Sequence, residues 1–176
     1  MHGRHLPCNG TQLLSADSGS AAGTHPGLRA LALVGASTAA AATLPRGTTV
    51  TQVRAGCSHS LARTSAGHLL SWGDNMSGQL GDGTTTTSDN PVSVMLPAGA
   101  RVRAVGATCR DSYALTANGH VLAWGDNGSA QLGDDGPASG SSIPVQVDLP
   151  NGWAASVLGT GPAAWHALAI VHKARP

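Results

Sequence analysis

Histidine, serine and aspartate are the residues of this sequence that could do chemistry. Imidazole is a common zinc ligand, but the histidines in the regular part of the chain lack H-E-x-x-H or Cys/His spacing: His59, His68, His120 and His166. Ser60 follows His59 directly, and neighbours on a strand point to opposite faces, so the two cannot act as nucleophile and base. We therefore expect no catalytic residue, no metal site and no cofactor.

Two aspartates occupy matching places, because Asp74 and Asp126 each follow a Trp-Gly pair and precede an asparagine. They predict one of two arrangements. Their carboxylates either form a polar rim that contacts a protein partner, or bond the backbone of their own turns, as Asx residues commonly do.

Tryptophan and glutamine recur in the same way. Trp72 and Trp124 could form an exposed aromatic surface for a partner, since tryptophan is enriched at interface hot spots. Their periodic placement favours packing between repeated units. Gln79 and Gln131 are expected to hydrogen-bond loop backbone, as buried polar groups must.

These residues belong to a sequence repeat with a period of about 52 residues. Residues 71–82, Ser-Trp-Gly-Asp-Asn-Met-Ser-Gly-Gln-Leu-Gly-Asp, return as residues 123–134, Ala-Trp-Gly-Asp-Asn-Gly-Ser-Ala-Gln-Leu-Gly-Asp. Over residues 50–83 and 102–135, about 19 of 34 positions are identical. Such a period is typical of propellers, solenoids and arrays.

Each repeat predicts four short antiparallel strands, which is the pattern of a propeller blade. A Leu-Pro-x-Gly turn comes before each unit. The expected strands in the first repeat are residues 50–53, 58–64, 68–72 and 91–96; in the second they are residues 102–105, 110–116, 120–124 and 144–149. The polar loops 82–90 and 134–143 separate the third and fourth strands.

The repeats resemble those of the regulator of chromosome condensation family, with its V-x-x-V-x-x-G, H-S-L-A-L and W-G-x-N-x-x-G-Q-L-G segments. The second copy departs from this pattern at Asp111, where the first has His59, and at Ala130, where the first has Gly78. The matching positions, which we expect to be structural, are Gly56, His59, Trp72, Gly73, Asn75, Gln79, Leu80, Gly81, Trp124, Gly125, Asn127, Gln131, Leu132 and Gly133.

The resemblance implies an all-β, propeller-type fold that is incomplete, with about two to three blades. We expect a tail over residues 1–43 and a repeat region over 44–176, with units near 50–100 and 101–153 and a partial unit over 154–176. Family members typically have seven blades, so the chain is expected to be part of a larger propeller or to form a homo-oligomer.

The composition limits which classes of partner the chain is expected to bind. The net charge is +1, and no basic run suggests nucleic-acid binding. No segment is long and apolar enough to span a membrane. Cys57 and Cys109 occupy the same repeat position and are expected to be small buried residues, because equivalent positions of adjacent blades seldom approach closely enough for a disulfide.

Residues 28–42 are apolar and rich in alanine. They predict either a secretory signal, which favours secretion over a cytoplasmic location, or a disordered or locally helical linker. The expected function is a non-catalytic module that binds a protein of unknown identity, with an inhibitory or scaffolding role. The alternative, implied by the family resemblance alone, is guanine-nucleotide exchange with chromatin contact.

Overall fold

The computed structural model describes residues 12–15, 29–32, 40–42, 44 and 47–174. These residues form thirteen β-strands and no helix. The sequence contains no glutamate and one lysine, so two good helix formers are nearly absent. Valine, threonine and serine are plentiful between glycine turns, and this composition favours short strands.

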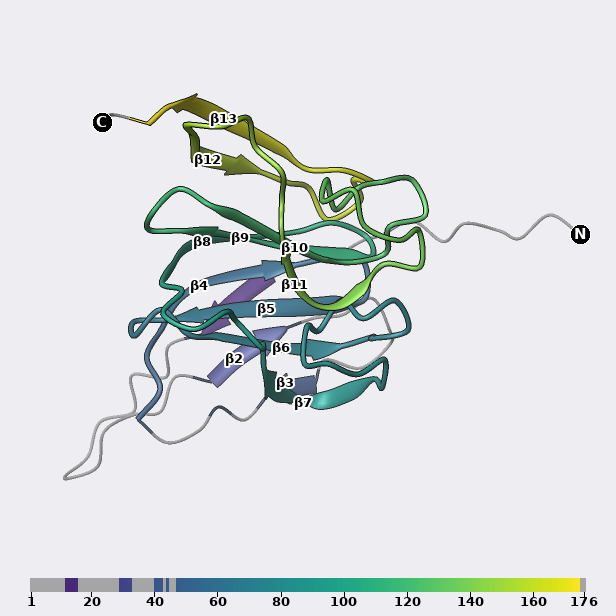
Figure 1. Ribbon diagram of the computed structural model, residues 1–176. Helices are drawn as coiled ribbons and strands as arrows, with labels where there is room; N and C mark the ends of the chain where they lie inside the picture. Colours follow the sequence, from purple (N-terminus) through teal and green to yellow (C-terminus); the bar gives the residue numbers. More distant parts are fainter. Residues whose placement is uncertain (1–11, 16–28, 33–39, 43, 45–46, 175–176) are drawn as a thin grey trace, which may run out of the picture.

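Two four-stranded antiparallel sheets form the centre of the molecule (Figure 1). Blade 1 has the order β4-β5-β6-β7 and blade 2 the order β8-β9-β10-β11. The strands of blade 1 are β4 (Val50–Ala55), β5 (His59–Thr64), β6 (Leu69–Gly73) and β7 (Ser88–Ser93). Those of blade 2 are β8 (Val102–Ala107), β9 (Asp111–Thr116), β10 (Val121–Gly125) and β11 (Ser141–Gln146). The predicted propeller-type blades are confirmed.

A third unit consists of β12 (Trp153–Gly159) and β13 (Leu168–Lys173), and it lies against the far side of blade 2 from blade 1 (Figure 1). In the part of the chain that the structure describes, the sheets do not close into a ring, as expected for an incomplete propeller. The second strand of this unit was expected near residues 165–170 and begins at Leu168 instead.

The fourth strands begin three residues before the predicted positions. The prediction placed Pro91 and Pro144 at the strand starts, because proline lacks a donor. Both prolines lie inside the observed strands, β7 and β11. These are edge strands of their sheets, where one missing donor is tolerated.

Three short strands precede the blades and form a sheet of order β1-β2-β3: β1 (Gln12–Ser15), β2 (Arg29–Ala32) and β3 (Ala40–Ala42). The stretches 29–32 and 40–42 are therefore strands, and not the helix or disordered linker that was one expectation for residues 28–42. The remainder of that segment, with the proposed signal, lies outside the described residues.

The main core lies between blades 1 and 2. Blade 1 contributes Leu61, Leu69 and Val94, and blade 2 contributes the facing set of Val102, Val105, Ala107, Ala114, Leu122 and Trp124. Trp124 is fully buried there. Trp72 is 4% exposed and packs with Val53, Ala62 and Leu70 on the other side of blade 1.

Cys57 and Cys109 form a disulfide, so the expectation of two separate buried thiols was wrong. Their Cα atoms lie 4.5 Å apart, within the range that a disulfide spans. The reason is that the first strands of the two blades, β4 and β8, lie side by side and bring the two equivalent turns together. The bridge joins blade 1 to blade 2.

Candidate interaction surface

The loop after β6 is held in shape by its own polar side chains. Asn75 is buried; its Oδ1 accepts from the Leu80 N–H at 2.8 Å, and its Nδ2 donates to the carbonyl oxygens of Thr84 and Thr86, each at 3.1 Å. Asp74 Oδ2 accepts from Gln79 Nε2 at 2.9 Å. One asparagine therefore connects the turn to the loop that follows it.

The loop after β10 repeats this arrangement. Asn127 Oδ1 accepts from the Leu132 N–H at 3.1 Å, and Asn127 Nδ2 donates to the Pro137 carbonyl at 3.1 Å. Asp126 Oδ1 accepts from the Gly128 N–H at 3.1 Å, and Gln131 Oε1 accepts from the Ser129 N–H at 2.7 Å. Asp74 and Asp126 thus bond within their own turns while remaining half-exposed.

The two loops form one surface, which we call the loop surface and define as residues 74–90 and 126–143. The Gly83 N–H donates to the Ser142 carbonyl at 2.9 Å, which links blade 1 to blade 2. A Cβ on Gly78 would lie 2.7 Å from Ser142 Cα, so glycine is required for this close approach. Residues 83–87 are exposed on this frame.

The charge of the loop surface is entirely negative. Six of the nine acidic residues of the protein lie in it, and it contains no lysine or arginine. These residues are Asp74, Asp82, Asp89, Asp126, Asp134 and Asp135. The formal charge of the whole chain is nevertheless +1, so the acidic character is local to this surface.

Beneath the loop surface, a buried hydrogen-bond chain crosses from blade 1 to blade 2. Ser112 Oγ donates to the Gln79 carbonyl at 2.8 Å, and Trp124 Nε1 donates to the same oxygen at 2.9 Å. Because the Ser112 hydrogen is used, His59 Nε2 donates to Ser112 Oγ at 2.9 Å. His59 Nδ1 is buried without a hydrogen-bond partner among the described residues. Burial lowers the pKa of His59 from 6.5 to about 4, so the imidazole is neutral, although Asp74 acts to raise it.

Asp111 stands at the position of His59 in the second repeat and is also buried. Burial raises the pKa of Asp111 from 3.8 to about 6, although Thr108 Oγ1 donates to its Oδ2 at 2.8 Å and favours the charged form. The neighbouring phenol of Tyr113 has its pKa raised, first by burial and then by Asp111. Tyr113 Oη donates to the Gln131 carbonyl at 3.2 Å.

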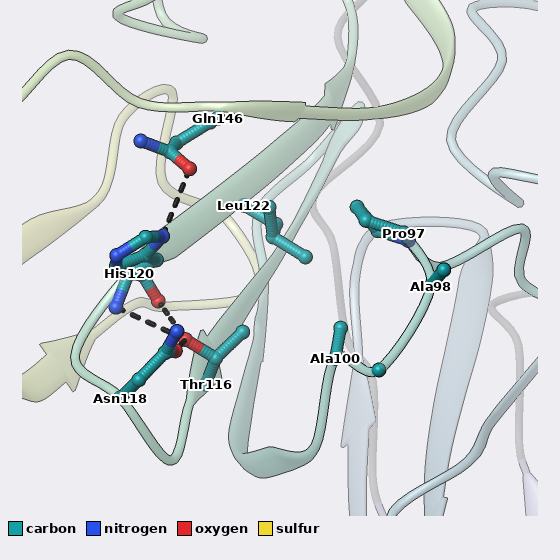
Figure 2. Close-up of a pocket in the computed structure, with 9 residues that line it drawn as sticks. Pro97, Ala98, Ala100, Thr116, Asn118, His120, Leu122 and Gln146 are labelled. Carbon is teal, nitrogen blue, oxygen red and sulfur yellow. Dashed lines mark hydrogen bonds between the residues drawn. The ribbon is translucent and has the colours of Figure 1, made fainter.

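Two small pockets lie at the other end of the blades, beside the turns that precede β6 and β10. The pocket in Figure 2, of about 180 Å³, lies between the Pro97–Ala100 turn and the β9–β10 hairpin. There His120 Nδ1 donates to Gln146 Oε1 at 2.9 Å, and Thr116 Oγ1 accepts from the His120 N–H at 3.0 Å. The equivalent pocket of blade 1, of about 310 Å³, contains Thr64 and His68. Among the described residues, no hydrogen bond joins a histidine ring to a hydroxyl group in either pocket.

The four histidines considered in the sequence do not converge: His59 is buried between the blades, His68 and His120 line different pockets, and His166 is exposed on the third unit. In the described part of the chain, no group of three histidine, cysteine or acidic side chains could hold a metal ion. The same residues contain no helix long and apolar enough to cross a membrane.

Sequence reasoning missed the contacts that join the repeats. The bonds His59–Ser112 and Gly83–Ser142 each connect residues more than fifty positions apart, which local patterns do not reveal. One signal was present: His59 and Asp111 break the repeat at the same position with two titratable groups.

Comparison with known proteins agrees with this geometry. Two family profiles match the chain, both of the regulator of chromosome condensation (RCC1) repeat, one over residues 66–115 and the other over residues 50–79. The chain carries RCC1 repeats over residues 50–115.

Relatives of this RCC1 repeat chain are much longer than it is. It is 39% identical over 105 residues to the human E3 ubiquitin-protein ligase HERC2, and this match covers 58% of this chain and 2% of HERC2. It is 37% identical over 84 residues to the ultraviolet-B receptor UVR8 of Arabidopsis thaliana, and this match covers 48% of this chain and 19% of UVR8. Prp20p of Saccharomyces cerevisiae shares the fold, with a TM-score of 0.62 at 19% identity over 70% of this chain and 31% of Prp20p.

Proposed function

We propose that this RCC1 repeat chain is a non-catalytic module that binds a positively charged protein through its loop surface. The observation that carries the proposal is that two loops, each fixed by a buried asparagine, are joined into one surface that is acidic throughout. A fixed frame lowers the entropy lost on binding, and complementary charge favours a basic partner.

The use of the acidic side chains supports a binding role. Asp74, Asp82 and Asp126 accept hydrogen bonds from their own loops, so these carboxylates shape the surface. Asp89 and Asp135 are exposed and supply charge to a partner. Prp20p, which shares this fold, binds Gsp1p and histones, and the yeast protein also binds Kap60. A protein-binding role for the present chain is consistent with that behaviour.

The test is binding of core histones, used as a basic-protein probe, to the full chain and to two variants. Asp89→Asn with Asp135→Asn removes two exposed charges from the loop surface. Asp148→Asn is the control, because Asp148 is exposed but lies outside the loop surface. We expect the double variant to bind about tenfold more weakly at low salt and Asp148→Asn to bind unchanged. Equal affinities for all three would refute the proposal.

Guanine-nucleotide exchange, the family alternative, is separated by a second assay. The chain spans less than a third of Prp20p. We expect no acceleration of nucleotide release from a small GTPase at concentrations that saturate the histone probe. Accelerated nucleotide release would indicate that the chain acts in guanine-nucleotide exchange and not as a scaffold or inhibitor.

A further inference from the structure

Two exposed apolar side chains lie next to each other where blade 1 meets blade 2. Met95 follows β7 and is 58% exposed, and Ile143 lies in β11 and is 45% exposed. A Cβ on Gly83 would lie 3.0 Å from Met95 Sδ and 3.9 Å from Ile143 Cγ2. The two side chains are therefore neighbours, although they come from different blades. We call Met95, Ile143 and the Gly83 between them the apolar patch.

Backbone hydrogen bonds hold both sides of the apolar patch in place. The Met95 N–H donates to the Gly81 carbonyl at 2.8 Å, which fixes the chain that leaves β7. The Gly83 N–H donates to the carbonyl of Ser142, the residue before Ile143, at 2.9 Å. The backbone of the patch is thus fixed before a partner arrives, so that little of its conformational freedom is lost on binding.

The second repeat shows that the fold does not require apolar residues at these positions. Asp148 is the equivalent of Met95, because its N–H donates to the Gly133 carbonyl at 2.7 Å in the same way. Asn90 is the equivalent of Ile143, because each precedes the proline of its fourth strand. Both Asp148 and Asn90 are exposed. A single exposed apolar residue needs no explanation, but an adjacent pair where the other repeat carries polar residues indicates binding.

The segments that form the apolar patch carry only negative charge. Residues 74–100 and 126–150 contain seven aspartates and no lysine, arginine or histidine. Asp82 directly precedes Gly83, and Asp89 is exposed in β7, the strand that leads to Met95. A second copy of this chain, docked through the same surface, would place aspartates against aspartates, and like charges oppose that contact. A partner that covers the patch must instead carry cationic residues beside an apolar one.

We propose that the apolar patch binds one aliphatic side chain of a partner segment in which lysine or arginine residues flank that side chain on both sides. This binding rests on the proposed function of the acidic loop surface and specifies which segment that surface selects. Contact with Met95 and Ile143 removes aliphatic surface from water, and the aspartates attract the flanking cations. The flexible thioether of methionine adapts to leucine, isoleucine or valine alike. An apolar centre with a polar rim is also the usual anatomy of a protein interface.

Two labelled peptides of equal charge provide the test: Arg-Lys-Arg-Leu-Arg-Lys-Arg, and the same peptide with serine in place of leucine. In extended form, the cationic residues on each side reach about 10 Å, which is about the Debye length at 0.1 M salt. Each peptide is titrated into the full chain and followed by fluorescence anisotropy. We expect the leucine peptide to bind about tenfold more tightly than the serine peptide. Added salt should weaken both peptides and leave this ratio unchanged, because salt screens only the charges.

Variants separate the apolar contact from the acidic charge. Met95→Gln with Ile143→Thr leaves the charge unchanged; it should reduce the preference for leucine to less than about twofold and leave the affinity for the serine peptide unchanged. Asp89→Asn with Asp135→Asn should weaken both peptides and keep the preference for leucine. Ile170→Thr is the matched control and should behave like wild type, because Ile170 is also exposed but lies in β13 of the third unit. A thermal melt of each variant checks folding.

The outcomes distinguish this inference from the proposed function. Equal binding of the two peptides to wild type would overturn the apolar contact while leaving the acidic loop surface in place. A preference for leucine that survives in Met95→Gln with Ile143→Thr would overturn it as well. If neither peptide binds and core histones do not bind, the proposed function fails, and the apolar contact fails with it.

Discussion

Gly78 and Ala130 occupy the same position of two repeats, and exchanging their residue types should have unequal effects. Both have positive φ, 81° at Gly78 and 57° at Ala130. A left-handed backbone costs a residue with a Cβ about 1–2 kcal/mol. Glycine loses about 0.4–1 kcal/mol more conformational freedom on folding than alanine. Ala130→Gly should therefore stabilise the protein by about 0.5–1 kcal/mol.

The reverse change, Gly78→Ala, should destabilise it by about 2–4 kcal/mol. It introduces the same backbone strain, and its Cβ would also lie 2.7 Å from Ser142 Cα, so the blades must separate. Overpacking of this kind costs about 1–3 kcal/mol. At Ala130, by contrast, the side chain is exposed.

Urea denaturation followed by tryptophan fluorescence measures both changes at pH 7, with the m-value showing whether unfolding stays two-state. If Ala130→Gly destabilises the protein, the argument from left-handed strain is wrong. If the cost of Gly78→Ala equals the gain from Ala130→Gly within about 0.5 kcal/mol, the contact with Ser142 has no energetic role.

Three further predictions concern the interior. Reduction of the disulfide between the blades should lower the free energy of unfolding by about 4 kcal/mol, because the bridge spans 52 residues; unchanged melting with reductant would contradict this. Neutral His59 stabilises the fold above pH 6.5, and this contribution is lost as the pH falls toward 4. Protonated Asp111 does the opposite: its contribution is present below pH 3.8 and is lost as the pH rises through 6. When the pH is lowered from 6.5 to 4, the free energy of unfolding of Asp111→Asn should therefore fall more steeply than that of wild type, whereas that of His59→Gln should rise. Urea titrations that give parallel pH profiles for the variants and wild type would refute both expectations. Trp124→Ala should cost about 3–5 kcal/mol, measured by the same titration, and a cost below about 1 kcal/mol would show that the blades repack without it.

The repeat predicted the blades well, because the alternation of apolar residues and the glycine turns within each repeat determine its hairpins locally. The third strands end at Trp72-Gly73 and Trp124-Gly125, within a residue of expectation. The predicted fourth strands began too late, because the prediction took Pro91 as the strand start. In the structure Ser88 already pairs with Gly73, so the strand begins earlier.

The candidate site was predicted only in part. Turn chemistry correctly suggested that Asp74 bonds its own loop, because that contact is local. The sequence gives no information on which blade turns touch, so neither the Cys57–Cys109 bridge nor the contact of Gly83 with Ser142 could be deduced. Both depend on how closely the sheets stack, which is set by side chains from several strands at once.

The position of the disulfide also determines how the chain responds to proteases. Cys57 and Cys109 enclose the exposed threonine segment 84–87 of the first loop. A single cut there leaves two pieces that remain covalently attached and share the core between blades 1 and 2. The nicked protein would therefore migrate as one species on a non-reducing gel and as two after reduction. This exposed loop can therefore be opened without releasing either blade.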